Sequence, residues 1–322
     1  MEIAAPVLSI VIPCYNEEEV LPETVSRLTE LLQRDIANNK IASDSHILLV
    51  DDGSKDGTWH LISELGKENL HIKGLRLAHN RGHQFALLAG LENANGDAIV
   101  SIDADLQDDI SVISTMIEAY KKGNDIVYGV RASRKTDTFF KRNTAQGYYW
   151  LLKKLGVDIV YNHADFRLMS RKTIEALKNY GEVNLFLRGI IPTLGFRTTQ
   201  VTYTRSERFA GESKYPLKKM LALALEGVTS FSIAPLRLIS GLGFAIFVIS
   251  MMVSMWAVYT YLMTDNAIPG WTSSVLPMYL LGGVQLLSLG MIGEYVAKTY
   301  METKRRPRYL IMNEINSDHS GD

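Results

Sequence analysis

Residues 99–108 read IVSIDADLQD, an apolar segment that runs into an acidic one. Its apolar half predicts a β-strand, and its acidic half places Asp103, Asp105 and Gln107 two residues apart. A strand points alternate side chains to one face, so the three would share a face if the extended backbone continued beyond the strand. Their oxygens would then form half a shell for a hard cation, and Mg²⁺ binds through one or two carboxylates plus the phosphates of a substrate. An acidic turn after a strand shows the same pattern, so the surrounding sequence has to decide.

The composition is that of a folded chain. It has 322 residues, of which 47% are hydrophobic, and a net charge of −1, which suits one or two domains and argues against a nucleic-acid binder. Cys14 is the single cysteine, which excludes an internal disulfide and fits a reducing compartment. The apolar run at residues 7–14 is too short for a secretory signal and lacks a basic flank. The N-terminal part is therefore expected to stay in the cytoplasm.

Strand-like and helix-like stretches alternate through residues 1–215. Strands are expected at 8–13, 47–50, 74–77, 98–102 and 126–130, and helices at 17–33, 58–67, 84–93 and 112–122. The alternation predicts an α/β domain on a mostly parallel sheet covered by helices. Ligands bind such sheets beyond the carboxyl ends of the strands. Polar clusters at 15–17, 51–54 and 103–107 each follow a strand and are expected at that edge.

Familiar nucleotide and zinc motifs are missing from the sequence. No Gly-x-Gly-x-x-Gly opens a helix after the first strand, and no Gly-x-x-x-x-Gly-Lys-Ser/Thr occurs, which disfavours a dinucleotide fold and a P-loop. His79 and His83 have the i, i+4 spacing of a zinc pair. No Cys or further His accompanies them, so a zinc site is not expected.

Two long uncharged stretches mark the C-terminal part. Residues 239–263 and 268–293 are each long enough to cross a hydrocarbon core of about 30 Å as a helix. They predict two transmembrane helices, although a buried helical hairpin would show the same pattern. Basic residues outside both stretches predict cytoplasmic ends. The expected parts are thus an α/β domain at 1–215, an amphipathic interfacial or linker helix at 216–235, and the two spans with a cytoplasmic tail at 236–322.

Three segments resemble the glycosyltransferase family 2 enzymes with the GT-A fold. They are SIVIPCYNEE at 9–18, DDGSKDGT at 51–58 and DADLQD at 103–108. More narrowly, the chain resembles the polyprenyl-phosphate glycosyltransferases, especially the bactoprenol glucosyltransferases, which are related to dolichol-phosphate mannose synthases. That likeness rests on DFRLMSR at 165–171, RSERFAGESKY at 205–215, GEY at 293–295 and RPRY at 306–309, and it covers nearly the whole chain.

The resemblance implies an activity, a cofactor and a location. It implies inverting transfer of a sugar, in the first place glucose from UDP-glucose, to undecaprenyl or another polyprenyl phosphate for cell-envelope glycans. It further implies Mg²⁺ or Mn²⁺ and a multi-pass protein of the bacterial inner membrane with a cytoplasmic catalytic domain. Another donor sugar such as mannose or a modified arabinose stays open, as do a non-catalytic subunit that binds nucleotide sugar and a homo-oligomer. The missing Gln-x-x-Arg-Trp motif disfavours a processive synthase.

The resemblance also assigns roles to particular residues. It implies metal contacts for Asp105 and Gln107, with Asp103 near both the ribose and the metal. It implies a nucleoside pocket lined by Pro13, Tyr15, Glu17 and Asp52.

Asp165 stands where the family's proposed base lies, and the residue before it is Ala164 instead of the commoner Gly. A phosphate acceptor is largely dianionic at neutral pH and needs a base less than a hydroxyl acceptor does. Orienting the sugar or a basic neighbour is therefore the alternative role for Asp165.

Two anionic substrates in one site call for cationic side chains, and Arg suits bidentate contacts with phosphate. Arg131 and Arg134 follow the strand expected at 126–130 and are predicted to bind the acceptor phosphate. Arg208 and Lys214 lie in a stretch with Gly and Ser that predicts a mobile loop, and they are predicted to bind the donor diphosphate. Each of these residues also suits a solvated surface.

Overall fold

The computed structural model describes residues 5–131, 163–183, 185–204, 234–263 and 270–316. The chain divides into two compact units. The first comprises Met1–Lys153, Asp158–Pro216 and Arg306–Asp322, and the second comprises Lys154–Val157 and Leu217–Arg305. The last residues of the chain thus belong to the same unit as the first.

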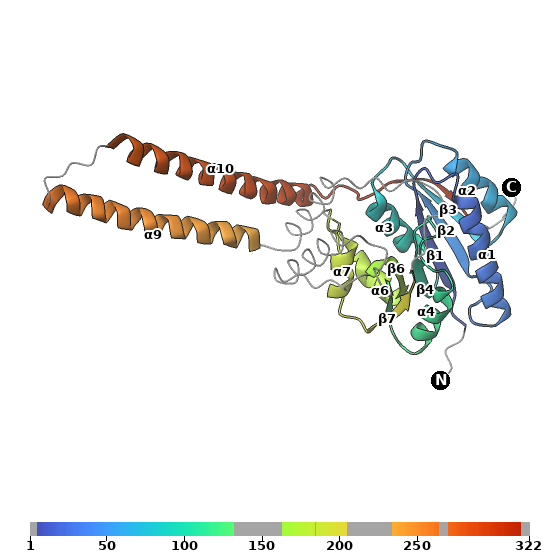
Figure 1. Cartoon of the computed structure of the whole chain (residues 1–322). Helices are drawn as coiled ribbons and strands as arrows, with labels where there is room; N and C mark the ends of the chain where they lie inside the picture. Colours follow the sequence, from blue (N-terminus) through green and yellow to red (C-terminus); the bar gives the residue numbers. More distant parts are fainter. Residues whose placement is uncertain (1–4, 132–162, 184, 205–233, 264–269, 317–322) are drawn as a thin grey trace. The chain divides into compact units, whose positions relative to one another are not determined.

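The first unit is built around one mixed sheet of eight strands in the order β7-β5-β6-β4-β1-β2-β3-β8 (Figure 1). Its strands are β1 (Leu8–Cys14), β2 (His46–Asp51), β3 (Ile72–Leu77), β4 (Ala98–Ser101), β5 (Ile126–Arg131), β6 (His163–Ser170), β7 (Thr198–Tyr203) and β8 (Ile311–Ile315). Strand β1 pairs in parallel with β2 and β4, and β2 pairs in parallel with β3, which confirms the parallel core expected from the alternation. Strands β6 and β8 are antiparallel to their neighbours, and neither they nor β7 were expected.

Helices cover both faces of this sheet (Figure 1). They are α1 (Leu21–Ala37), α2 (Thr58–Glu68), α3 (His83–Asn93), α4 (Val112–Lys121), α6 (Arg171–Lys178) and α7 (Leu187–Thr193). The side chains of Ile10 and Ile12 belong to one core cluster with α1, α2 and α4, whereas Val11, which points to the opposite face, meets α3.

Helix α1 begins four residues later than expected. Asn16 has a left-handed backbone (φ 55°), and the next amide, that of Glu17, donates to the Thr58 hydroxyl at 2.9 Å. The chain therefore makes a turn here before the helix starts.

Helix α3 lies close against the sheet because of Gly90. A Cβ at this position would overlap the side chains of Val11 and Val50 on β1 and β2. Protein interiors are packed so densely that an added methyl group needs a shift of its surroundings. The position of α3, and of the residue that begins it, thus depends on a residue without a side chain.

The second unit contains α9 (Ala234–Met263) and α10 (Gly270–Thr303), so helices do cover the two uncharged stretches. Within the described parts of the chain, however, no helix is both long and apolar enough to cross a membrane, and the predicted transmembrane helices are not supported. The helix expected at 216–235 lies outside the described residues except for its last two, where α9 begins.

The packing of α3 predicts that Gly90→Ala destabilises the first unit. Overpacking costs about 1–3 kcal/mol, which exceeds the gain of about 1 kcal/mol in helix propensity. Thermal unfolding of the full chain, followed by circular dichroism, should show a lower Tm. Gly181→Ala is the matched control, because no atom lies within 4 Å of a Cβ built there. An unchanged Tm for Gly90→Ala would contradict the tight packing.

Candidate functional site

Polar groups join the loops that follow β1 and β2. The Asn16 amide donates to Ser54 Oγ at 3.0 Å, and the Asn16 side-chain oxygen accepts from the Lys55 amide at 2.9 Å. The Glu17 amide donates to Thr58 in the same region. Two of the polar clusters expected at the carboxyl edge of the sheet are therefore bound to each other.

The residues of the predicted nucleoside pocket lie at this edge. Pro13 is buried in β1, Tyr15 just beyond it is 40% exposed, and Glu17 is half-buried. The fold shows only where these residues lie, so their contact with a nucleoside stays a prediction.

Asp52, the fourth of these residues, holds the loop that precedes α3. Its two carboxylate oxygens accept hydrogen bonds from the amides of Arg81 (2.7 Å) and Gly82 (2.8 Å). Burial raises the pKa of Asp52, although these two amides oppose the shift. Gly53 follows with φ +67°, and a Cβ there would come within 2.8 Å of the Asn80 amide nitrogen. The end of β2 and the loop before α3 thus form one structure.

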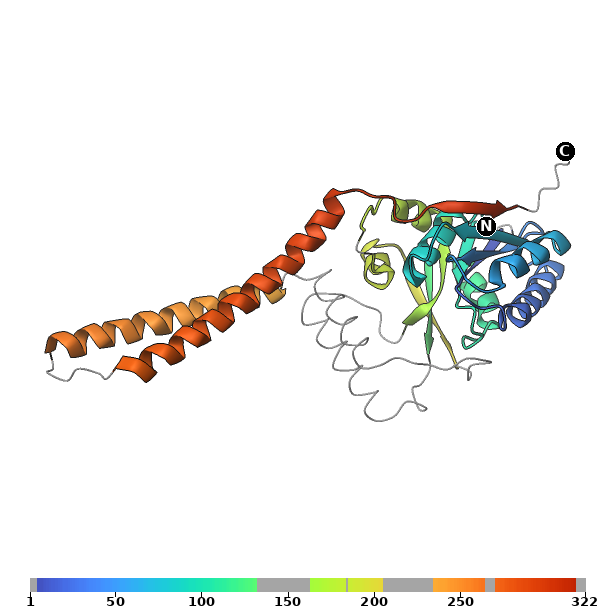
Figure 2. The ribbon, with the colours of Figure 1, turned by 90° about the horizontal axis from the view of Figure 1, so that it is seen from above.

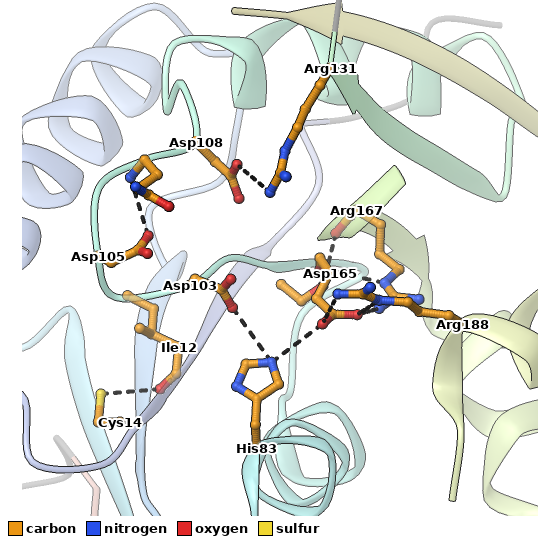
Figure 3. Close-up of polar contacts among 12 residues, drawn as sticks. Ile12, Cys14, His83, Asp103, Asp105, Asp108, Arg131, Asp165, Arg167 and Arg188 are labelled. Carbon is orange, nitrogen blue, oxygen red and sulfur yellow. Dashed lines mark hydrogen bonds and ion pairs between the residues drawn. The ribbon is translucent and has the colours of Figure 1, made fainter. Parts of the chain in front are cut away.

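The acidic motif leaves the strand earlier than its spacing suggested. Strand β4 ends at Ser101, and Leu106 has a left-handed backbone (φ 53°), so residues 103–107 do not continue as an extended strand. Asp105 Oδ1 accepts from the Gln107 amide at 3.2 Å, which closes a turn. Thr24 of α1 donates to the Ala104 carbonyl at 2.7 Å. Figure 3 accordingly shows Asp103 turned toward His83 and Asp105 lying apart from it.

Asp103 carries the feature that best fits a bound cation. Its Oδ1 is buried and has no hydrogen-bond partner among the described residues, and His83 Nε2 lies 3.5 Å away. Burial raises the pKa of Asp103 to about 6, while the charge of His83 lowers it. No group of three or more His, Cys, Asp or Glu side chains in the described ranges forms a cation site by itself. Mg²⁺ bound through one or two carboxylates and a substrate's phosphates needs no such group, so these residues fit a cation whose shell the substrate completes.

Asp165, on β6, lies at the centre of a second cluster (Figure 3). Its carboxylate accepts from Arg167 Nη2 at 2.5 Å and from Arg188 Nη2 at 3.0 Å, and His83 Nε2 lies 3.4 Å away. Burial would raise the pKa of Asp165, but the hydrogen bond from His83 and the charges of Arg188 and Arg167 outweigh it and hold the pKa well below its usual range. The carboxylate is therefore ionised at neutral pH and is a weak proton acceptor.

His83 links the two acidic segments. It begins α3 and lies between Asp103 and Asp165. Burial lowers the pKa of His83, but the hydrogen bond with Asp165 and the charge of Asp103 outweigh it, so the pKa is raised. From the sequence alone, His83 was considered only as half of a zinc pair. Its place after Gly82 at the start of a helix was the available signal.

Arg167 and Arg188 were also missed as site residues. Arg167 lies within the DFR motif, but its side chain is 0% exposed in a strand, where a charge is not expected. Arg188 lies on α7, 23 residues after Asp165, and no local pattern connects the two.

Arg131, predicted to bind the acceptor phosphate, lies in a third group. Its Nη2 is 3.8 Å from Asp108 Oδ1, and its Nε donates to the Tyr203 hydroxyl at 3.4 Å. That hydroxyl donates to Asp108 at 2.5 Å. Binding of a phosphate by Arg131 stays a prediction. The other predicted phosphate ligands, Arg134, Arg208 and Lys214, lie outside the described residues.

Known proteins align with this chain over most of its length. The chain is 53% identical over 313 residues to the uncharacterized glycosyltransferase YkoT of Bacillus subtilis strain 168, with 97% of this chain and 93% of that protein covered. It is 40% identical over 311 residues to the bactoprenol glucosyl transferase of Shigella phage SfV, with 95% and 98% covered. It is also 40% identical over 308 residues to the prophage bactoprenol glucosyl transferase homolog of Escherichia coli K12, with 94% and 98% covered.

A family model identifies the part of the chain that carries the site. Residues 9–178 match the model described as glycosyl transferase family 2, and this range contains Asp103, Asp105, His83 and Asp165. The mixed α/β sheet agrees with the GT-A-like fold that the sequence predicted. The chain therefore belongs to glycosyl transferase family 2.

Proposed function

We propose that this protein transfers a glucosyl group from a nucleotide diphosphate sugar to a polyprenyl phosphate, with inversion at the anomeric carbon. The bactoprenol glucosyl transferases that align with nearly the whole chain support the sugar and the lipid. The observation that carries the proposal is the buried Asp103 oxygen without a hydrogen bond, at the carboxyl edge of the sheet where α/β folds bind ligands. UDP-glucose is the donor that we infer first.

Asp103 and Asp105, with Gln107, are the residues that would hold Mg²⁺ or Mn²⁺. When bound, such a cation supplies a Lewis acid that stabilises the charge growing on the donor's diphosphate. The protein's contribution is to keep two carboxylates after β4 and to fix the backbone that carries them, at Ala104 through Thr24 and from Asp105 to Gln107 through the Asp105 side chain.

The acceptor supplies its own nucleophile. An oxygen of the lipid phosphate bonds to the anomeric carbon while the bond from that carbon to the diphosphate breaks, and the nucleoside diphosphate leaves. A phosphate monoester has a second pKa of about 6, so the attacking oxygen carries no proton in most molecules at neutral pH. Asp165, with its depressed pKa, is thus better suited to hold Arg188 and His83 in place than to act as a base.

The two substrates determine where the reaction takes place. A polyprenyl phosphate is a membrane lipid, and a nucleotide sugar is a soluble cytoplasmic metabolite. We therefore infer that the first unit works at the cytoplasmic face of the bacterial inner membrane, as the lipid named for the relatives supports.

A panel of donors tests the proposed reaction. Purified full-length protein is incubated with undecaprenyl phosphate and with UDP-glucose, UDP-galactose or GDP-mannose, each with Mg²⁺, Mn²⁺ or a chelator. We expect a glucosylated lipid from UDP-glucose in the presence of metal. A product formed only from GDP-mannose would mean that the transferred sugar is mannose instead of glucose. The absence of product with every donor would contradict a transferase role.

Asp105→Asn tests the cation and diphosphate site. Removing one negative ligand should lower kcat by about 10²–10³-fold, because stabilisation of the leaving group is the main demand of this reaction. Asp109→Asn is the matched control, since it makes the same charge change four residues later, and Asn can still accept the amide hydrogen bond from Ser111. A wild-type rate for Asp105→Asn would rule out the role.

Asp165→Asn tests the buried charge pair. The change leaves the Arg167 guanidinium, which is 0% exposed, without its carboxylate, so at pH 7 unfolding should be easier by about 3–5 kcal/mol. Because the folded-state pKa of Asp165 is depressed, its contribution is complete above the unfolded pKa of about 4 and is lost as the pH falls through the folded value.

The difference between Asp165→Asn and wild type, measured by urea unfolding, should therefore shrink below about pH 4. Asp125→Asn is the control, because its partner Lys172 is 63% exposed. Equal losses of stability in the two variants would contradict a larger contribution of the buried charge pair than of the exposed one.

A further inference from the structure

The chain returns to the first unit immediately after α10. Strand β8 pairs antiparallel with β3 and forms the edge of the sheet, with Gly74 opposite Ile315 and Leu77 opposite Ile311. Figure 2 shows β8, in red, lying along the first unit. Ile315 packs on Gly66 and Gly74, where a Cβ would come within 2.8 and 3.1 Å of its side chain. The last described strand is therefore an integral part of the sheet.

Two residues just before β8 hold the end of α3. Arg308 Nη2 donates to Glu92 Oε1 at 2.6 Å, and the Tyr309 hydroxyl donates to Glu92 Oε2 at 2.6 Å. Arg308 Nη1 also donates to the Tyr180 carbonyl at 2.6 Å. The side chains of Arg308 and Glu92 are only 17% and 11% exposed. Both oxygens of Glu92 are thus used in short, charge-assisted contacts of the kind that fix geometry.

The same segment holds the loop that precedes α3. The Arg308 carbonyl accepts from Arg81 Nε at 2.9 Å, and the Leu310 carbonyl accepts from the Ala78 amide at 2.9 Å. On its other side, this loop gives the amides of Arg81 and Gly82 to Asp52. Residues 78–82 therefore lie between the end of β2 and the C-terminal segment, and His83 follows them directly.

Strand β8 could serve only to cover the backbone groups of β3, but that role does not explain the contacts of Arg308. Strand β8 alone hides the unpaired backbone groups of β3. The contacts of Arg308 lie outside the β-ladder and are made with α3, with its preceding loop and with the Tyr180 carbonyl. They fix a helix that begins with His83 and has no side-chain cap of its own.

We propose that the side chain of Arg308 is a positioning residue for the donor site, acting through Glu92 on α3 and thereby on His83 and the loop at 78–82. The bond from Arg81 goes to the main-chain carbonyl of Arg308 and does not depend on its side chain. Arg308 touches no reacting atom. It keeps His83 between Asp103 and Asp165 and keeps the loop on Asp52, which is predicted to line the nucleoside pocket. The effect on the donor rests on the proposed function, whereas the effect on the loop does not.

Hydrogen exchange and kinetics of the full-length protein test the two parts separately. In Arg308→Ala, amides of α3 and of the loop before it, residues 78–93, should exchange about tenfold faster than in wild type, while β1 and β2 stay protected, because α3 loses the contact at Glu92. The KM for UDP-glucose should rise about tenfold, and the KM for undecaprenyl phosphate should stay within about twofold, because only the donor side is displaced. Arg308→Lys should recover part of both effects, since it keeps the charge but loses the two-pronged geometry.

Arg306→Ala is the matched control, because Arg306 is exposed and lies two residues away. If Arg308→Ala unfolds the first unit, Glu92→Gln removes the charge from the same pair and should give the same local exchange pattern. Wild-type exchange at 78–93 in both Arg308→Ala and Glu92→Gln would overturn the proposal. Faster exchange with an unchanged donor KM would overturn the link to the donor. Absence of transfer by the wild-type protein would instead count against the proposed function and leave the exchange result standing.

Discussion

The site depends on the compensation of one buried charge. Arg167 lies in β6 with 0% of its side chain exposed, and an uncompensated guanidinium in that position would cost several kcal/mol. Asp165, two residues earlier on the same face of the strand, supplies the opposite charge. The pairing of β6 with β4 then brings this charge to the acidic motif. Ser101 is opposite Arg167, so in an antiparallel pair the residue two beyond Ser101, Asp103, comes near Asp165.

The pKa values of Asp103 and Asp165 are shifted in opposite directions. Asp165 has a depressed pKa because His83, Arg188 and Arg167 surround it, whereas burial without a hydrogen bond to Oδ1 raises the pKa of Asp103. Environments that push neighbouring pKa values apart commonly give two acidic groups different tasks. Here the Asp165 carboxylate already binds Arg167 and Arg188, whereas the Asp103 carboxylate has an oxygen that can bind a metal cation. His83 lies between the two carboxylates and so connects the charge cluster of Asp165 with Asp103.

Local patterns predicted the parts of the fold that local patterns determine. Strands β1 to β5 and helices α2 to α4 follow the alternation of apolar runs with helical periods, and each lies within a few residues of its expected range. Strand β6 was missed because the fully buried Arg167 interrupts the apolar pattern by which strands are found. Strand β8 was missed because its partner β3 lies more than 230 residues earlier, and β8 itself is short and largely exposed.

The candidate site shows the same division. Asp103 and Asp105 were predicted as cation ligands from their spacing, although the turn at Leu106 shows that the extended geometry behind that prediction does not hold. Arg188 and the role of His83 could not be found, because their contacts with Asp165 depend on how β6, α3 and α7 come together.

The order of the chain gives the second unit an unusual position in the sequence. Its helices α9 and α10 are inserted between β7 and β8, two strands at opposite edges of the same sheet. An element joined to a domain at both ends closes a loop, so its ends are restricted in a way that a terminal anchor is not. One of these ends enters the first unit at Arg306 and reaches Arg308 two residues later. Arg308, which holds the end of α3 through Glu92, is therefore among the first residues of the chain on its return to the first unit.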